Sequence, residues 1–262
     1  DNGWLKDLDD KILKNIEIFY GDIRDFDSVY DSLKKTDIVL HLAALIAIPY
    51  SYTSPTSYVQ TNIDGTMNVL RASRKHNLEQ VIHISTSEVY GSAQYVPINE
   101  SHPLVAQSPY AASKTSADQL AYSFYTSFDL PVSIARPFNT FGPRQSLRAI
   151  IPTIMSQIIR DEKKIHLGNT KTTRDFNYVK NTTKALCDFI GNKKTIGEVI
   201  NIGSGVEISI EDLVTQIIKL SGKNIEVSED SKRVRPHKSE VSRLCADTSK
   251  AKKILKNKFD ND

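Results

Sequence analysis

The sequence has little of the chemistry that marks disulfide-bonded, metal-binding or membrane-spanning proteins. Its only two cysteines, Cys187 and Cys245, are isolated, so they offer neither a disulfide framework nor paired metal ligands. Such cysteine usage is typical of a reducing cytoplasm, where we expect this protein to be. No stretch approaches the ~18 consecutive apolar residues of a transmembrane helix, so we expect no membrane partner. His166 and His237 are scattered, so we expect no metal site.

Charge of one sign is not in excess either. The 34 Lys and Arg residues nearly balance the 31 Asp and Glu residues, which leaves a net charge of +3 spread along the chain. Because no basic stripe with interleaved aromatic residues stands out, we expect no nucleic-acid partner. The 262 residues, of which 39% are hydrophobic, are enough for one α/β domain, alone or with a smaller lobe.

A glycine-rich phosphate-binding loop is also missing. No Gly-x-Gly-x-x-Gly follows the first expected strand, although that loop binds the dinucleotide pyrophosphate in many α/β sheets. Gly203-Ser-Gly205 is the only Gly-x-Gly, and it comes late in the chain without a third glycine. We interpret it as a tight turn.

What the sequence does contain is a regular alternation of apolar strand patterns and helical patterns. This alternation predicts a parallel, doubly wound α/β sheet with helices on both faces. Beyond Pro143 the predicted elements become shorter and more mixed, which favours a smaller C-terminal lobe. The predicted strands are 16–20, 37–44, 81–86, 132–135, 164–168, 176–179 and 199–202, and the helices are 5–13, 26–33, 57–76, 109–128, 150–160, 185–190 and 210–220.

Two segments carry reactive side chains. Ser85-Thr-Ser-Glu-Val-Tyr-Gly91 ends an apolar strand, and Tyr110-Ala-Ala-Ser-Lys114 opens a helix. The four-residue spacing places the phenol of Tyr110 and the ammonium of Lys114 on one helix face. A nearby cation favours the phenolate, which predicts a lowered pKa for Tyr110 and a role as a base. Thr86 could hydrogen-bond the same oxygen.

With Ala135-Arg-Pro-Phe-Asn-Thr-Phe-Gly-Pro-Arg144 downstream, these segments resemble the extended short-chain dehydrogenase/reductase family. Within it the chain is most similar to the nucleotide-sugar 4,6-dehydratases, in particular those that act on N-acetylglucosamine nucleotides in legionaminic acid synthesis. The resemblance implies NAD as cofactor, a nucleotide-diphosphate sugar as partner and a homodimer. It also implies an NAD-binding Rossmann domain over 1–141 and a mainly substrate-binding lobe over 142–262, with segments of about 175–202 returning to the sheet. We expect the first βαβ unit, about 45 residues in that family, to be lacking.

The same resemblance assigns roles to individual residues, which are grouped by function. The catalytic set is Thr86, Glu88, Tyr110 and Lys114, and Asn62 supports the strand that carries the active-site hydroxyl. The substrate set is Ser87 and Asn139, with Arg174 and Arg235 as a clamp on the diphosphate, since guanidinium groups suit bidentate phosphate contact. The cofactor set is Asp22, Ile23, Leu42, Ala43, Ala44, Pro137, Tyr110 and Lys114.

Glu88 decides which reaction the resemblance implies. After Tyr110 and NAD oxidise the sugar C4 hydroxyl, a carboxylate can remove the acidified C5 proton and drive loss of water across C5–C6. The product is a 4-keto-6-deoxy sugar with NAD regenerated. Because Ser87 stands where some dehydratases have Asp, the proton donor to the leaving hydroxyl is open, with protonated Glu88 as our candidate. Three alternatives stay open: a 4-epimerase, a uronate decarboxylase and a non-catalytic dinucleotide-sensing protein of the same fold.

Overall fold

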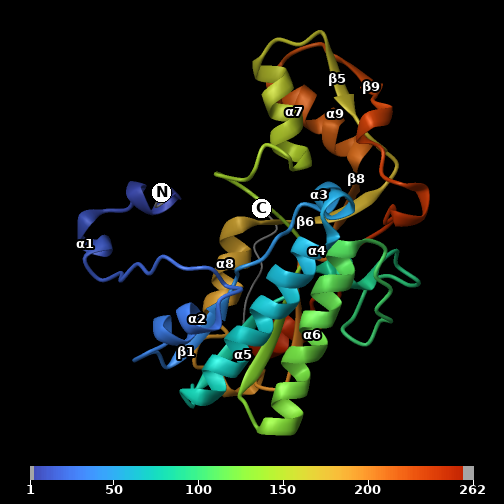
Figure 1. Cartoon of the computed structure of the whole chain (residues 1–262). Coiled ribbons are helices and arrows are strands. Elements are labelled where there is room, and N and C mark those ends of the chain that lie inside the picture. The colour runs from blue at the N-terminus through green and yellow to red at the C-terminus, as the bar shows by residue number, and fades with distance from the viewer. Residues whose placement is uncertain (1–2, 256–262) are drawn as a thin grey trace.

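The main sheet has four parallel strands in the order β1-β2-β3-β7. The structure is a computed structural model, and it describes residues 3–255. The strands are β1 (Ile38–His41), β2 (Gln80–Ile84), β3 (Val132–Pro137) and β7 (Val199–Ile202). Because all four run in the same direction, their carboxyl ends share one edge of the sheet (Figure 1).

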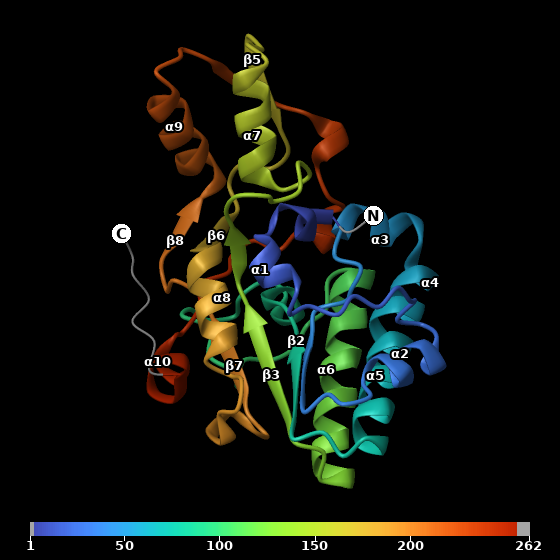
Figure 2. The same cartoon turned by 90° about the vertical axis from the view of Figure 1, so that its left-hand side faces the viewer.

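Helices cover both faces of this sheet, which confirms the doubly wound α/β prediction (Figure 2). On one face α2 (Phe26–Ser32), α5 (Gly65–Lys75) and α6 (Pro109–Phe128) bury residues such as Phe124 against the strands. On the other face, residues of α8 (Val179–Cys187) and α10 (Ser249–Leu255) pack against β2, β3 and β7.

The sequence explains where α6 starts and ends. Ser108 caps the helix, because its hydroxyl accepts a hydrogen bond from the backbone N–H of Ala111 at 3.1 Å. Pro109 follows at the first helical position, where its missing N–H is not needed. The helix ends at Asp129, whose backbone is left-handed with φ of 52°.

The predicted helix over 57–76 is interrupted by a wider turn. After α3 (Ile48–Thr53), the chain forms α4 (Pro55–Tyr58), a π-helical turn (Val59–Asp64) and then α5. The extra residue of a π turn rotates the side chains that follow. Within the turn, Asn62 is buried in the protein interior.

A second lobe lies beyond the carboxyl edge of the main sheet (Figure 1). Its core is formed by apolar side chains of two helices and one strand, including Ile154, Ile165 and Val214. A small three-stranded sheet in the order β4-β6-β8 lies between this core and the main sheet. The lobe and this small sheet contain α7 (Ile150–Ile159), α9 (Ile210–Ser221), β5 (Lys164–Leu167), β9 (Glu226–Glu229), β4 (Asn139–Phe141), β6 (Thr173–Tyr178) and β8 (Glu207–Ser209).

The predicted strand over 16–20 is wrong. These residues have no strand pairing in the described structure, and Tyr20 is 74% exposed. Strands need a hydrogen-bonded neighbour, and β1 pairs only with β2 within residues 3–255. For the same reason Ile38 to Leu40 of β1 are only partly buried, although the sequence predicts a fully buried strand.

The remaining short elements connect these layers. The predicted helix over 5–13 is broken into a 3-10 turn (Gly3–Asp7) and α1 (Asp10–Leu13). The predicted helix over 185–190 begins earlier, as α8, and ends at Cys187. The other 3-10 turns are Ser87–Tyr90, Lys193–Thr195, Ser231–Arg233 and His237–Ser239.

The division into two domains at about residue 141 stays a prediction. Within 175–202, β7 is a strand of the main sheet, whereas residues 175–178 belong to β6, which pairs with β4 and β8. Helix α10 also packs on the main sheet. Residues 256–262, at the end of the predicted C-terminal lobe, lie outside the described residues.

Gln80 should be a main polar contributor to stability. Its buried side-chain N–H₂ donates to Phe189 O at 2.9 Å and Thr195 Oγ1 at 3.0 Å, and its Oε1 accepts from Gly191 N–H at 2.9 Å. Gln80→Ala leaves these groups unpaired in the interior, so we expect urea denaturation to show a loss of about 2–4 kcal/mol in the free energy of unfolding. The matched change at exposed Gln119 should stay within about 0.5 kcal/mol, and equal losses would contradict this role.

Candidate active site

A short turn after β2 carries two of the predicted catalytic residues. Thr86 caps the 3-10 helix Ser87–Tyr90, because its hydroxyl accepts from the backbone N–H of Glu88 at 3.3 Å. The turn ends at Gly91, whose φ of 66° suits glycine. The side chain of Glu88 is held at the carboxyl edge of the sheet with only 11% of it exposed.

Helix α6 brings the other two catalytic residues to the same place. Tyr110 and Lys114 lie one turn apart and are both buried. The phenol of Tyr110 is hydrogen-bonded to Thr86 and lies in the electrostatic field of Glu88. The ammonium of Lys114 donates to the carbonyl oxygen of Ile84, the last residue of β2, at 2.6 Å. The structure therefore gathers all four predicted catalytic side chains.

The pKa values of this pair differ from the sequence-based expectation. Burial raises the pKa of Tyr110, and the hydrogen bond with Thr86 opposes this only in part. The predicted lowering by Lys114 is wrong, because the ammonium is directed at Ile84 O and not at the phenol. Burial lowers the pKa of Lys114 to about 8, with the charge of Asp118 acting in the opposite direction.

Asp118, one turn further along α6, was not found from the sequence. Its Oδ2 accepts from the hydroxyl of Ser85 at 2.7 Å and from Arg136 Nε at 3.0 Å, and all three side chains are buried. The guanidinium of Arg136 also donates to Tyr90 Oη at 3.0 Å. His83 lies 3.2 Å from Asp118 and is fully buried, and this burial lowers its pKa.

Three of the predicted cofactor residues follow β1 at the carboxyl edge. Leu42 and Ala43 are exposed and Ala44 is partly exposed, so an open apolar surface begins where the strand ends. The loop that they open is fixed by Asn62, whose amide group bonds both Leu45 N–H (2.8 Å) and Leu45 O (2.9 Å). Asn62 also donates to Ser113 Oγ of α6 at 2.9 Å, so it supports this loop and not the strand with the active-site hydroxyl.

The other predicted cofactor residues have different surroundings. The carboxylate of Asp22 is exposed, and hydrogen bonds from Arg24 lower its pKa to about 2. Ile23 packs into the core beneath α5, with its side chain close to Gly65. Pro137 is partly buried at the end of β3. Asp22 alone of this group presents a polar side chain at the surface.

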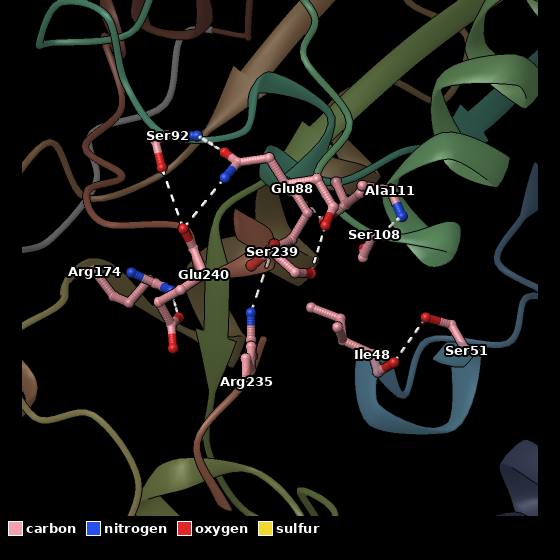
Figure 3. Close-up of polar contacts among 12 residues, drawn as sticks. Ile48, Ser51, Glu88, Ser92, Ser108, Ala111, Arg174, Arg235, Ser239 and Glu240 are labelled. Atoms are coloured by element: carbon pink, nitrogen blue, oxygen red, sulfur yellow. Dashed lines mark hydrogen bonds and ion pairs between the residues drawn. The ribbon is translucent and has the colours of Figure 1, made fainter. Parts of the chain in front are cut away.

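The two arginines of the predicted substrate set, Arg174 and Arg235, lie in a charged cluster with Glu88 and Glu240 (Figure 3). Arg235 Nη1 lies 4.0 Å from Glu88 Oε2, and Arg174 Nη2 lies 3.8 Å from Glu240 Oε1. Burial, followed by the positive charge of Arg235, lowers the pKa of Arg174, while Glu88 and Glu240 act to raise it. The two predicted arginines therefore converge, with Glu240 as a partner that no sequence pattern indicated.

Two polar atoms near this cluster have no hydrogen-bond partner within the described residues. They are Arg235 Nη1 and Asn139 Oδ1, and both are buried. Leaving buried polar atoms unpaired is unfavourable, so such atoms mark a place where a ligand can bind. Ser87, the remaining predicted substrate residue, is itself buried.

A hollow of about 320 Å³ lies in the second lobe, beside α7 and β5. Arg233 lines one wall, two residues from Arg235, and His166 and Gln157 line another. No sequence pattern indicated this hollow, because its walls come from segments that are distant in the chain. Among residues 3–255, no cluster of His, Cys, Asp and Glu could hold a metal ion, and no helix is long and apolar enough to cross a membrane.

Known proteins are similar to this chain in sequence and in fold. The sequence matches the family described as GDP-mannose 4,6 dehydratase over residues 2–259. The chain belongs to this family. It is 32% identical over 231 residues to dTDP-glucose 4,6-dehydratase of Streptomyces antibioticus, an alignment that covers 88% of this chain and 68% of the relative. The chain spans between half and about two thirds of the length of the first curated relatives that it matches.

Solved structures of the family superpose well on the chain. The dTDP-glucose 4,6-dehydratase of Streptomyces venezuelae with NAD bound has a TM-score of 0.84 and 27% identity, covering 92% of this chain and 74% of that one. A UDP-glucuronic acid 4-epimerase mutant of Bacillus cereus, in complex with a UDP-sugar and NAD, has a TM-score of 0.90 and 30% identity, covering 100% of this chain and 81% of that one. Solved structures of a dehydratase and of an epimerase therefore share the fold found here.

The buried ammonium of Lys114 should give stability a distinctive pH dependence. Its pKa in the folded chain, about 8, is below the ordinary value of 10.5, so the unfolded chain binds more protons between these two values. The free energy of unfolding should therefore rise with pH from about 8 to 10.5, by up to about 3 kcal/mol from this group. Urea denaturation of Lys114→Met from pH 7 to 10.5 should lose this rise.

The matched control for that measurement is exposed Lys163→Met. It should keep the pH dependence of the unaltered chain. If both variants show the same slope, Lys114 is not the group responsible.

Proposed function

We propose that this chain carries the active site of an NAD-dependent nucleotide-sugar 4,6-dehydratase, a hydro-lyase that produces a 4-keto-6-deoxy sugar. The observation that carries the proposal is the position of Glu88, a buried carboxylate within the electrostatic reach of the Tyr110 phenol and 4.0 Å from Arg235. Simple oxidation of an alcohol needs, besides a nicotinamide to accept the hydride, only the tyrosine and lysine. A carboxylate beside them supplies the second proton-transfer group that elimination requires.

The residues divide the reaction between them. Tyr110 takes the proton of the sugar C4 hydroxyl as C4 becomes a ketone, and Thr86 holds the phenol in place by its hydrogen bond. This transfer uses the phenolate form, which requires a positive charge beside it because burial raises the pKa of Tyr110 in this chain. Glu88 then takes the proton from C5, the bond from C6 to its hydroxyl breaks, and protonated Glu88 returns the proton to the leaving oxygen, so that water is lost. When C6 receives the hydride, C5 takes up a proton that comes from solvent. Ser87 is a hydroxyl and not a carboxyl, which leaves Glu88 as our candidate for both transfers.

The residues present fit the nicotinamide end of NAD. An ammonium has three N–H donors, and among residues 3–255 Lys114 donates to one acceptor, Ile84 O. Its other donors can therefore bind the ribose hydroxyls of the cofactor. The exposed apolar surface at Leu42 and Ala43 can lie against a cofactor. When bound, NAD accepts a hydride from C4 and returns one to C6. A glycine-rich loop for the pyrophosphate is not part of this sequence.

The substrate diphosphate would bind between Arg174 and Arg235. Arg235 Nη1 supports this assignment, because it faces Glu88 only at 4.0 Å and has no hydrogen-bond partner within the described residues. Asn139 Oδ1 also has no such partner there, and it can accept a hydrogen bond from a sugar hydroxyl. The nucleoside would extend past Arg233 into the 320 Å³ hollow. An N-acetylhexosamine nucleotide is our proposed substrate, on the basis of the resemblance to the legionaminic acid enzymes.

A 4-epimerase is the second candidate, because the likeness to the Bacillus cereus 4-epimerase is as extensive as the likeness to the dehydratases. The two reactions differ in what happens to the C5 hydrogen and the C6 oxygen of the sugar. Elimination replaces the C5 hydrogen with solvent hydrogen and removes the C6 oxygen, whereas 4-epimerisation retains both. Incubation of the intact protein with nucleotide sugars in D₂O, with the product identified by NMR, distinguishes them. The homodimer and the cytoplasmic location stay predictions.

Substitutions at Tyr110 and Glu88 should block different steps. Tyr110→Phe removes the hydroxyl needed for the first proton transfer, so we expect every step to stop. Glu88→Gln should still allow oxidation at C4, seen as transient NADH absorbance, while solvent exchange at C5 falls at least ~100-fold. Glu79→Gln, at an exposed position, is the control. Formation of the 4-keto-6-deoxy product by Glu88→Gln at the unaltered rate would show that Glu88 is not the base.

The two arginines should contribute to nucleotide binding and not to cofactor binding. Each charge-assisted contact is worth on the order of 1.5–3 kcal/mol, so Arg235→Ala should weaken binding of a nucleoside diphosphate about tenfold or more. Lys at either position should restore only part of the loss, because it lacks the bidentate fork. We expect calorimetric titration to show unchanged NAD affinity, with exposed Arg71→Ala as control. Equal losses for both ligands would instead indicate a structural role.

A further inference from the structure

The side chain of Gln107 joins three segments that are far apart in the sequence. Its Oε1 accepts from the backbone N–H of Ser92 at 2.5 Å. Its N–H₂ donates to the carbonyl oxygens of Lys238 at 3.0 Å and Glu240 at 3.2 Å. In addition, the backbone carbonyl of Gln107 accepts from the hydroxyl of Ser239. Figure 3 shows Ser92, Ser239 and Glu240 meeting at this point.

The segment that Gln107 binds, Arg235–Glu240, is here called the arm. The arm supplies two charged side chains to the site. Arg235 lies near Glu88 of the catalytic turn, and Glu240 lies near Arg174 of β6. Gln107 itself directly precedes Ser108, the cap of the helix that carries the catalytic tyrosine. One side chain therefore connects the arm to the start of α6.

Gly91 makes room for this connection. A Cβ atom at this position would lie 2.7 Å from Gln107 Oε1 and 2.2 Å from the carbonyl oxygen of Val105, too close for either. Gly91 ends the turn that presents Glu88, and Ser92, which follows it, donates to Gln107. The carboxamide of Gln107 thus contacts both the catalytic turn and the arm.

We propose that Gln107 is a positioning residue that holds the arm over Glu88, so that Arg235 is placed to receive the substrate diphosphate. The proposal rests on the function proposed above. Its physical basis is geometric: two donated bonds fix the carbonyl groups of residues 238 and 240, and the accepted bond fixes the turn. Without them, three hydrogen bonds among those described still hold the arm: Tyr52 Oη to Ser239 Oγ at 2.6 Å, Ser239 Oγ to the backbone carbonyl of Gln107, and Ser92 Oγ to Glu240 O at 3.4 Å.

The test compares Gln107→Ala and Gln107→Glu in the intact protein, with Gln119→Ala as the control. Glutamate keeps the acceptor for Ser92 N–H, but it places a carboxylate against two carbonyl oxygens and should release the arm as alanine does. We expect calorimetric titration with pyrophosphate, UDP, dTDP and GDP to show at least tenfold weaker binding of those ligands that the unaltered protein binds. NAD affinity should stay within about twofold.

A double substitution separates positioning from a general effect on the fold. Arg235→Ala combined with Gln107→Ala should bind the same diphosphate no more weakly than Arg235→Ala alone, because Gln107 acts through Arg235. Additive losses, or a parallel loss of NAD affinity, would overturn the proposal.

Hydrogen exchange provides a readout without any ligand. Backbone amides of residues 237–242 should exchange at least tenfold faster in both Gln107 variants than in the control. If the unaltered protein binds neither pyrophosphate nor any of the nucleoside diphosphates, the proposed function fails, and this measurement alone decides whether Gln107 holds the arm. Unchanged exchange would overturn the positioning role whatever the ligands do.

Discussion

The buried carboxylate of Asp118 joins the elements on which the proposed chemistry depends. It lies on α6 one turn after Lys114, and it accepts from Ser85 at the end of β2 and from Arg136 on β3. A buried carboxylate is tolerated only when it is paired and hydrogen-bonded, so this arrangement permits little displacement of the helix along the strands. Because Thr86 follows Ser85 directly, the same bond sets the register between the threonine turn and the tyrosine helix.

Near Asp118, the site buries ionisable side chains, which lowers the stability of the folded chain. Burial raises the pKa of Tyr110 and lowers that of Lys114 to about 8, so the folded chain resists forming either charged group. Perturbed pKa values of this kind concentrate at functional sites, where reactivity takes precedence over stability. On the substrate side the charges are balanced within the chain, since Glu88 and Glu240 face the two guanidinium groups. A diphosphate would therefore meet two guanidinium groups whose positions are already fixed by these carboxylates.

Much of the fold could be predicted from local pattern. The alternation of strand and helix gave the parallel doubly wound sheet, and Ser108-Pro109 marked the start of α6, because caps and periodicity depend on neighbouring residues. The strand expected over 16–20 did not form, since pairing depends on a neighbouring strand and not on the apolar pattern alone. The pKa of Tyr110 was also misjudged, because spacing along a helix does not show which acceptor an ammonium chooses.

The sequence by itself determined which chemical groups the site contains and how Tyr110 and Lys114 share one helix face, since both follow from residue identity and helix geometry. It did not reveal Gln107, Glu240 or Asp118 as parts of the site. Gln107 bonds Lys238 and Glu240 of the arm, which are 131 and 133 residues away in the sequence. Asp118 accepts from Arg136, which is 18 residues away. Only the tertiary structure decided these contacts, because hydrogen bonds act over about 3 Å and cannot form until folding brings distant segments together.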